Sequence, residues 1–468
     1  MSKYDELMQE KSKLMLQSVG IDYDKYEKGN IAFDYETMMS DIGYSIKDII
    51  DIQRETGVGN TPLIELKNLT TLARQVSKSG KAARIFIKDE QCNPSGSFKD
   101  RRAAISIYEA KKRGYKGVVS ATSGNYGAAV ASQSAMRGLD CIIVQECYDS
   151  QKVGQPEIIE KARKCEAFGA EVVQLTVGPE LFYVFLKIIK DTGYFNASLY
   201  SPLGIAGTES LGYEIAKQCL ESLERYPDAV VVTHAGGGNV TGTARGLIKA
   251  GAIDSKIIGA SVDLSGLHMA SDSDFNKKSF TTGHTGFGIP FMTYPDRSDV
   301  PRSAARPLRY LDRYVTVNQG SVFYMTELLA QIEGLERGPA GNTSLAAAFS
   351  LAQEMENDQV IVVQETEYTG AGKHIMPQLS FAKNNNIEIL INENVLDEIP
   401  GKNIILPIGP WALRYKEMDL NKYRKSLIKN LLRDSKVQEL KEIDIDFLCK
   451  ETRYSKEEVN NILRDLEL

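Results

Sequence analysis

The sequence predicts an α/β protein built on open, mostly parallel β-sheet, with a helical extension at each end of the chain. Two observations support this prediction. From "GNTPLIEL" at residue 59 onward, short apolar runs alternate with glycine-containing turns and longer amphipathic segments, the pattern of parallel strands joined by crossover helices. The flanking segments, 1–57 and 411–468, instead mix charged and apolar residues at helical spacing.

The N-terminal extension is represented by "YSIKDIIDIQRETG", in which apolar residues recur at helical spacing. We expect it to pack on the body of the protein or on a partner chain. The C-terminal extension, as in "KSLIKNLLRDSKVQELKEIDIDF", is dense in Lys, Glu and Asp. A solvated helical surface and a docking surface for another subunit both fit this composition.

Seven strands are expected between the extensions, because each candidate is a short apolar run bounded by turn residues. They span residues 83–88, 117–122, 140–145, 170–175, 229–234, 256–262 and 359–364. Helices are expected in the gaps, for instance over 155–168 and 343–355. In such sheets, ligands bind at the carboxyl ends of the strands, so the residues after each strand are the first candidates for a site.

Composition excludes several classes of function. The 468 residues suffice for two packed domains, and 56 basic residues are interspersed with 62 acidic ones. This balance gives no basic field for nucleic acid. No apolar run reaches the roughly 18 residues of a membrane span. We expect a cytoplasmic protein without nucleic-acid or membrane partners.

Cysteine and histidine usage predicts no metal site. Six cysteines and four histidines are scattered along the chain without a CxxC pair or the spacing of metal ligands. Free, mostly buried thiols in a reducing compartment are expected. The residues are Cys92, Cys141, Cys147, Cys165, Cys219 and Cys449, with His234, His268, His284 and His374.

The first candidate for chemistry is Lys99, in "NPSGSFKDRRAA", between a turn and a predicted helix. The partial positive charge of a helix N-terminus disfavours an ammonium group, which makes the amine a better nucleophile. Such a lysine can form an imine with a carbonyl compound. The alternative is a solvent-facing lysine paired with Asp100.

Three further motifs follow predicted strands. Ser123, Gly124 and Asn125 come after strand 117–122, where small residues allow close approach and an asparagine amide can donate a directed hydrogen bond. A plain turn explains them equally well. "ETEYTGAGKH" follows strand 359–364 and places Thr366 between two glutamates, Glu365 and Glu367.

The remaining motif, "AGGGNVTG" after strand 229–234, opens a helix with three consecutive glycines. Their backbone N–H groups and the helix dipole together form a phosphate cradle. The spacing is not that of the dinucleotide fingerprint, and a Walker lysine is absent. We therefore expect a small phosphorylated ligand. An imine-forming lysine, an asparagine donor, a phosphate cradle and a hydroxyl at a strand end jointly fit pyridoxal 5'-phosphate.

Four of these motifs carry a family resemblance: "GNTPLIEL", "NPSGSFKDR", "TSGNYGAA" and "GGGNVTG", in this order. Over residues 58–380 the chain resembles the fold-type II (tryptophan synthase beta-like) pyridoxal-phosphate enzymes, which include threonine synthase and cysteine synthase. The resemblance implies two open, mostly parallel sheets with helices on both faces. It also implies a large cofactor-binding domain from 58–112 and 206–410, and a small domain from 113–205.

The resemblance also assigns site residues. It implies that Lys99 is the catalytic Schiff-base lysine, that Asn125 bonds the 3'-oxygen of the cofactor, and that Thr366 meets its pyridine nitrogen. Ser123, Gly124 and Tyr126 are expected to contact substrate, although a packed aromatic explains Tyr126 equally well. We further hypothesise that Glu365 or Glu367 raises protonation of the ring nitrogen. The residues implied to bind the cofactor phosphate are Gly236, Gly237, Gly238, Asn239 and Val240.

Within the family, the whole chain, extensions included, resembles the large subunits of two-subunit, coenzyme A-dependent thiolases of anaerobic ornithine degradation. This implies thiolytic cleavage of 2-amino-4-oxopentanoate to acetyl-CoA and alanine, with coenzyme A as co-substrate, a small alpha subunit as partner, and an oligomeric enzyme. Three alternatives remain: a β-eliminating or β-replacing enzyme, similar to threonine synthase or diaminopropionate ammonia-lyase; a non-catalytic cofactor-binding subunit; and a nucleotide-binding dehydrogenase, which the absence of GxGxxG disfavours.

Overall fold

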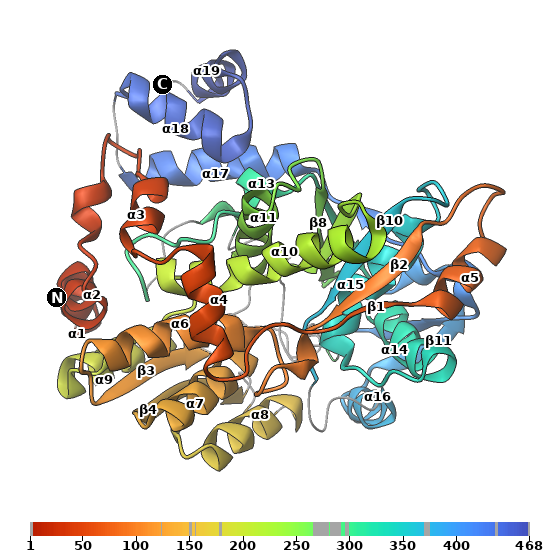
Figure 1. Ribbon diagram of the computed structural model, residues 1–468, viewed down its shortest axis with the longest axis horizontal. Helices are drawn as coiled ribbons and strands as arrows, with labels where there is room; N and C mark the ends of the chain where they lie inside the picture. Colours follow the sequence, from red (N-terminus) through yellow and green to blue (C-terminus); the bar gives the residue numbers. More distant parts are fainter. Residues whose placement is uncertain are drawn as a thin grey trace.

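The computed structural model describes residues 3–122, 124–148, 152–154, 156–176, 180–264, 280, 292–294, 299–368, 375–435 and 439–466. Two parallel-rich sheets form its body, and the helical ends of the chain lie together on one side (Figure 1). The predicted α/β class is therefore confirmed.

The larger sheet has seven strands in the order β1-β2-β10-β7-β8-β9-β13. The five central strands are parallel, and the short edge strands β1 and β13 are antiparallel to their neighbours. The bounds are β1 (Leu63–Glu65), β2 (Arg84–Asp89), β7 (Ala229–Thr233), β8 (Lys256–Val262), β9 (Arg313–Val317), β10 (Val360–Glu365) and β13 (Lys416–Glu417).

The smaller sheet has four parallel strands in the order β5-β4-β3-β6. Its strands are β3 (Gly117–Thr122), β4 (Asp140–Tyr148), β5 (Glu171–Thr176) and β6 (Phe195–Asn196). A separate parallel pair consists of β11 (Glu388–Asn392) and β12 (Asn403–Pro407). The division of the chain into domains stays a proposal, and β13 lies just beyond its boundary at residue 410.

Helices cover both faces of the sheets (Figure 1). They are α1 (Lys3–Gln9), α2 (Lys11–Val19), α3 (Tyr35–Asp41), α4 (Ile46–Arg54), α5 (Lys67–Gln75), α6 (Lys99–Lys112), α7 (Asn125–Arg137), α8 (Pro156–Ala167), α9 (Glu180–Thr192), α10 (Pro202–Leu223), α11 (Gly238–Lys249), α13 (Pro307–Tyr310), α14 (Gln319–Glu333), α15 (Pro339–Ala352), α16 (Ile375–Asn384), α17 (Leu420–Ser435), α18 (Glu442–Thr452) and α19 (Lys456–Asp465).

Alternating side chains of the central strands explain why the larger sheet is buried on both faces. In β10, Val360 and Val362 belong to the apolar cluster that contains α10 and α11, whereas Ile361 and Val363 belong to the cluster that contains α14 and α15. A strand buried on both sides reads as a continuous apolar run. This is why four of the five central strands, β2, β7, β8 and β10, were predictable from the sequence.

All seven predicted strands are confirmed: two have the expected bounds, and the ends of the others differ by at most three residues. The prediction is wrong in that it missed six strands: β1, β6, β9, β11, β12 and β13. Four of the six have a physical reason: β1, β6 and β13 have two or three residues, and β11 is largely exposed. Such strands carry little apolar signal.

The two extensions meet each other in space, although they lie at opposite ends of the sequence (Figure 1). A carboxylate oxygen of Asp444, in α18, accepts hydrogen bonds from the backbone N–H groups of Ile31 and Ala32 at 2.8 and 2.9 Å. Glu451, also in α18, pairs with Arg306 and Arg309 beside α13. The C-terminal extension therefore packs on the body rather than standing free in solvent.

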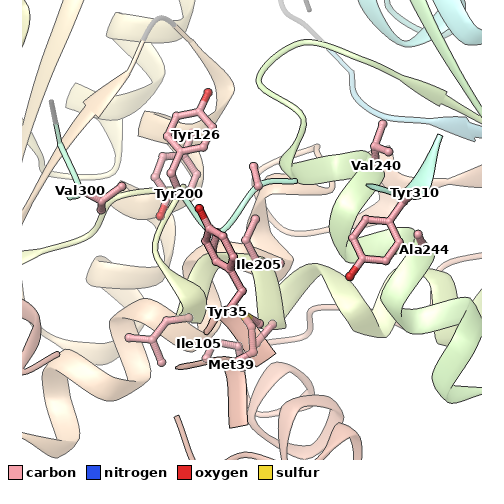
Figure 2. Close-up of a cluster of buried hydrophobic side chains, with 14 of the residues drawn as sticks. Tyr35, Met39, Ile105, Tyr126, Tyr200, Ile205, Val240, Ala244, Val300 and Tyr310 are labelled. Carbon is pink, nitrogen blue, oxygen red and sulfur yellow. The ribbon is translucent and has the colours of Figure 1, made fainter. Parts of the chain in front are cut away.

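An apolar cluster joins the N-terminal extension to the helices beside the site (Figure 2). Its members include Tyr35 and Met39 from α3, Ile205 of α10 and Val240 of α11. Four of the six expected free thiols are buried, at Cys141, Cys147, Cys165 and Cys219. No helix in the described ranges has the length and apolar character needed to cross a membrane.

Candidate active site

One pocket collects most of the predicted site residues. It lies between the two sheets and has a volume of about 170 Å³. Nine predicted residues line it: Lys99, Gly124, Asn125, Tyr126, Gly236, Gly237, Gly238, Asn239 and Thr366. The side chain of Val240 is fully buried in the apolar cluster instead (Figure 2), and Ser123 lies outside the described residues.

Lys99 is the first residue of α6, as expected. Its ammonium nitrogen lies 5.1 Å from the centre of the Phe98 ring and has no hydrogen-bond or ion-pair partner among the described residues. Burial lowers the pKa of Lys99 to about 8, with a further contribution from Arg102 and Lys161, while Glu367 opposes the shift. The amine is thus more nucleophilic than an ordinary lysine, mainly because it is withdrawn from water.

Asp100 does not pair with Lys99, so the alternative explanation of this lysine is wrong. The Asp100 carboxylate is fully buried and accepts a hydrogen bond from the backbone N–H of Ser95 at 2.7 Å. Burial raises its pKa to about 7. Asp100 therefore holds the turn before Lys99 in place and leaves the lysine free.

Backbone hydrogen bonds tie the lysine loop to the loop after β10. Phe98 N–H donates to the Thr366 carbonyl at 3.0 Å, and Tyr368 N–H donates to the Gly96 carbonyl at 2.8 Å. Ser97 and Glu367 form an antiparallel bridge between these contacts. This short ladder brings Lys99 and Thr366 to one side of the pocket.

The glycine loop has the form of an anion cradle. Gly237 has a φ of +82°, in the left-handed region, and α11 begins at Gly238. Within the described part of the chain, no acceptor takes a hydrogen bond from the backbone N–H groups of Gly236 to Val240. Side chains are excluded sterically: a Cβ on Gly236 would lie 1.9 Å from the Tyr200 hydroxyl oxygen.

Thr366 and Glu367 line the pocket, whereas Glu365 does not. The Glu365 side chain is fully buried behind them, and neither carboxyl oxygen has a hydrogen-bond partner among the described residues. Burial raises the pKa of Glu365 well above its ordinary value, with the nearby Asp89 as a lesser cause. Of the two glutamates in our hypothesis, only Glu367 is placed to act on a ligand.

Several residues that line the pocket were not predicted from the sequence: Phe98, Arg102, Glu146, Lys161 and Tyr200. Arg102 lies one helical turn after Lys99 and so shares its helix face, a signal present in the sequence. Glu146 directly follows the predicted strand 140–145. Lys161 comes from α8, and only the fold brings it near Gly124.

The pocket fits pyridoxal phosphate. The backbone N–H groups of the glycine loop have no acceptor among the described residues, and the loop has no room for Cβ atoms. Such a loop can bind a phosphate group. An unpaired lysine amine matches an aldehyde, and the Asn125 amide and Thr366 hydroxyl face the pocket without protein hydrogen-bond partners in the described ranges. No described group of His, Cys, Asp or Glu side chains has the arrangement of a metal site.

Fold and pocket together define a pyridoxal-phosphate enzyme, and sequence comparison agrees. Residues 54–367 match the family of pyridoxal-phosphate dependent enzymes, and the chain belongs to this family. It is 64% identical over 464 residues to the 2-amino-4-ketopentanoate thiolase beta subunit of Acetoanaerobium sticklandii, covering 99% of this chain and 98% of the relative. A probable cysteine synthase of Bacillus subtilis is 27% identical, over 65% of this chain and 90% of the relative.

Solved structures support the fold. A cysteine synthase from Entamoeba histolytica aligns with a TM-score of 0.52 at 24% identity, covering 67% of this chain and 86% of that one. A pyridoxal 5'-phosphate-dependent aspartate racemase aligns with a TM-score of 0.55 at 20% identity, covering 69% and 94%. Both therefore share the two-sheet body of this chain.

Proposed function

We propose that this chain is the large subunit of a two-subunit thiolase that cleaves 2-amino-4-oxopentanoate with coenzyme A to acetyl-CoA and alanine, in ornithine degradation. The observation that carries the proposal is the 64% identity to a 2-amino-4-ketopentanoate thiolase beta subunit over 99% of the chain. This match includes both terminal extensions, whereas the family match covers only residues 54–367. The word "beta" in the relative's name supports a partner alpha subunit.

Lys99, Asn125, Thr366 and the glycine loop would hold pyridoxal phosphate. When bound, the cofactor supplies an aldehyde that joins the substrate amine and an electron-withdrawing ring that weakens bonds near Cα. Lys99, with its lowered pKa, would accept the proton of the substrate Cα at Nζ. Gly124 and Tyr126 would border the substrate.

Cleavage requires the thiol of coenzyme A to add at C4 while the bond between C3 and C4 breaks. The acetyl group leaves as acetyl-CoA, and C3 takes up a proton to complete alanine, so atoms balance. Lys99 and Glu367 line the pocket and are the groups we propose for carrying this proton. We further propose coenzyme A as co-substrate, an oligomeric enzyme and a cytoplasmic location.

The test is product analysis with the full chain, its candidate small subunit, coenzyme A and 2-amino-4-oxopentanoate. Formation of acetyl-CoA and alanine in equal amounts, lost in Lys99→Ala, is the expected result. Ammonia or a keto acid formed without coenzyme A would instead identify a β-eliminating enzyme, the chemistry suggested by the cysteine synthase and threonine synthase relatives. Turnover that survives Lys99→Ala would reject this chain as the catalytic subunit.

A further inference from the structure

Arg102 is a buried arginine without a carboxylate. Its side chain is 2% exposed, and no acidic residue in the described ranges pairs with it. Its Nε donates to the Thr208 hydroxyl at 3.0 Å, and its Nη1 approaches the Leu199 carbonyl at 3.5 Å. A buried guanidinium normally requires a negative partner, and none of the described residues supplies one to Arg102.

Two other buried arginines, Arg101 and Arg306, have carboxylate partners, unlike Arg102. Arg101 lies beside Glu90 and Glu214, at 2.7 and 2.8 Å. Arg306 is paired with Glu451 and Glu36. Burial lowers the pKa of Arg102 to about 10, whereas carboxylate neighbours raise the pKa values of Arg101 and Arg306. Arg102 thus differs from both in its surroundings.

The free end of Arg102 points at the glycine loop. A Cβ placed on Gly238 would lie 2.6 Å from Nη2 and 3.0 Å from Nη1 of Arg102. The guanidinium carbon lies 5.3 Å from the centre of the Phe98 ring, a cation–π contact. The same loop carries the Asn239 side-chain amide, which is 6% exposed and whose Nδ2 has no hydrogen-bond partner in the described ranges.

We infer that Arg102, together with the Asn239 amide, binds the phosphate group of the cofactor and supplies the charge that a glycine loop alone lacks. The inference rests on the proposed cofactor site, but not on the thiolytic reaction. A guanidinium donates two directed hydrogen bonds to phosphate oxygens and retains its charge at every physiological pH. Arg102 therefore favours the doubly charged form of the phosphate.

Pyridoxal and pyridoxal 5'-phosphate provide the test, because only the second carries the phosphate. The dissociation constant of each is measured by absorbance titration of the cofactor-free full chain. In Arg102→Met, which retains packing on Phe98, affinity for pyridoxal phosphate should fall about 10- to 100-fold while affinity for pyridoxal stays the same. Arg102→Lys should recover part of the loss.

Two controls separate binding from folding. Arg245→Met removes a half-buried arginine of helix α11, one whose partners are Glu209 and Glu36, and should weaken both ligands alike or neither. The ³¹P resonance of the bound cofactor should stay independent of pH in the natural chain and titrate in Arg102→Met. If Arg102→Met weakens both ligands equally, or neither, the inference is wrong; if the natural chain binds neither ligand, the proposed cofactor site itself fails.

Discussion

The ammonium group of Lys161 lies 4.0 Å from the carboxylate of Glu367, in the wall of the pocket. Lys161 also pairs with Glu157 at 2.6 Å, and all three side chains are more than nine-tenths buried. Burial raises the pKa of Glu157 even though Lys161 opposes the shift. One cation thus compensates two buried acids in the part of the chain that also places Lys99 in the pocket lining.

Removing that cation should be costly. In Lys161→Met, Glu157 and Glu367 would lose their nearest positive charge, and we expect the free energy of unfolding to fall by about 3–5 kcal/mol. Urea denaturation measures the change. Lys187→Met is the matched control, because Lys187 pairs with Asp191 on an exposed helix surface, and should cost less than about 1 kcal/mol. Equal losses in the two variants would contradict the prediction.

The rate at which Lys99 captures the cofactor should depend on pH with a break near 8. Only the neutral amine attacks an aldehyde, so the rate should rise about tenfold per pH unit below pH 8 and level off above it. Stopped-flow absorbance of the cofactor-free chain measures this. Glu367 raises the pKa of Lys99, so Glu367→Gln should move the break to lower pH. A break near 10.5, the ordinary lysine value, would disprove the effect of burial.

Glu365 should make the protein less stable as pH rises. Its pKa is raised in the folded chain, so the folded state retains a proton that the unfolded state has released. Stability is therefore full below the ordinary glutamate value of 4.5 and declines as pH rises through the folded value. Glu365→Gln should reduce this decline between pH 5 and neutrality, measured by urea denaturation. Glu166→Gln, at a surface position, should retain the full decline.

The C-terminal extension should support the cofactor loop. Arg306 is held by Glu451, and its backbone N–H donates to the Thr241 hydroxyl at 2.8 Å. The next residue, Pro307, lies against Gly237, where a Cβ would be 2.6 Å away. We expect Glu451→Gln to lower stability by roughly 2 kcal/mol, since Glu36 still pairs with Arg306.

Cofactor affinity of Glu451→Gln, measured by the same titration, should fall several-fold because the loop loses its support. Glu442→Gln is the matched control in the same helix: Glu442 pairs with Lys456 on the surface and should leave both quantities nearly unchanged. Affinity that stays constant while stability falls would show that the extension acts on folding alone.

Much of the fold was predictable because parallel strands buried on both faces leave continuous apolar runs, as in β7 and β10. The pocket was predictable where its lining residues follow a predicted strand, as Asn125 and the glycine loop do. The place of Lys161 in the pocket was not predictable. In the sequence, Lys161 and Glu157 are four residues apart, the spacing of an ordinary ion pair on a helix surface. The burial of Lys161 follows only from how α8 packs beside the pocket.

The roles of the two glutamates beside Thr366 were equally beyond the sequence. Successive residues of an extended chain point to opposite sides, so Glu365 is buried behind the strand while Thr366 faces the pocket. The bridge between Ser97 and Glu367 then directs Glu367 toward Lys161. The direction of the Glu367 side chain therefore depends on a non-local backbone pairing that no local pattern encodes.

The backbone ladder between Gly96–Phe98 and Thr366–Tyr368 has a mechanical consequence. It joins Lys99 and Thr366 to one rigid frame, whereas Asn125 belongs to the smaller sheet, on the opposite jaw of the pocket. A relative movement of the two sheets would therefore change the distances from Asn125 to Lys99 and Thr366, whereas the backbone hydrogen bonds of the ladder limit any change in the distance between Lys99 and Thr366.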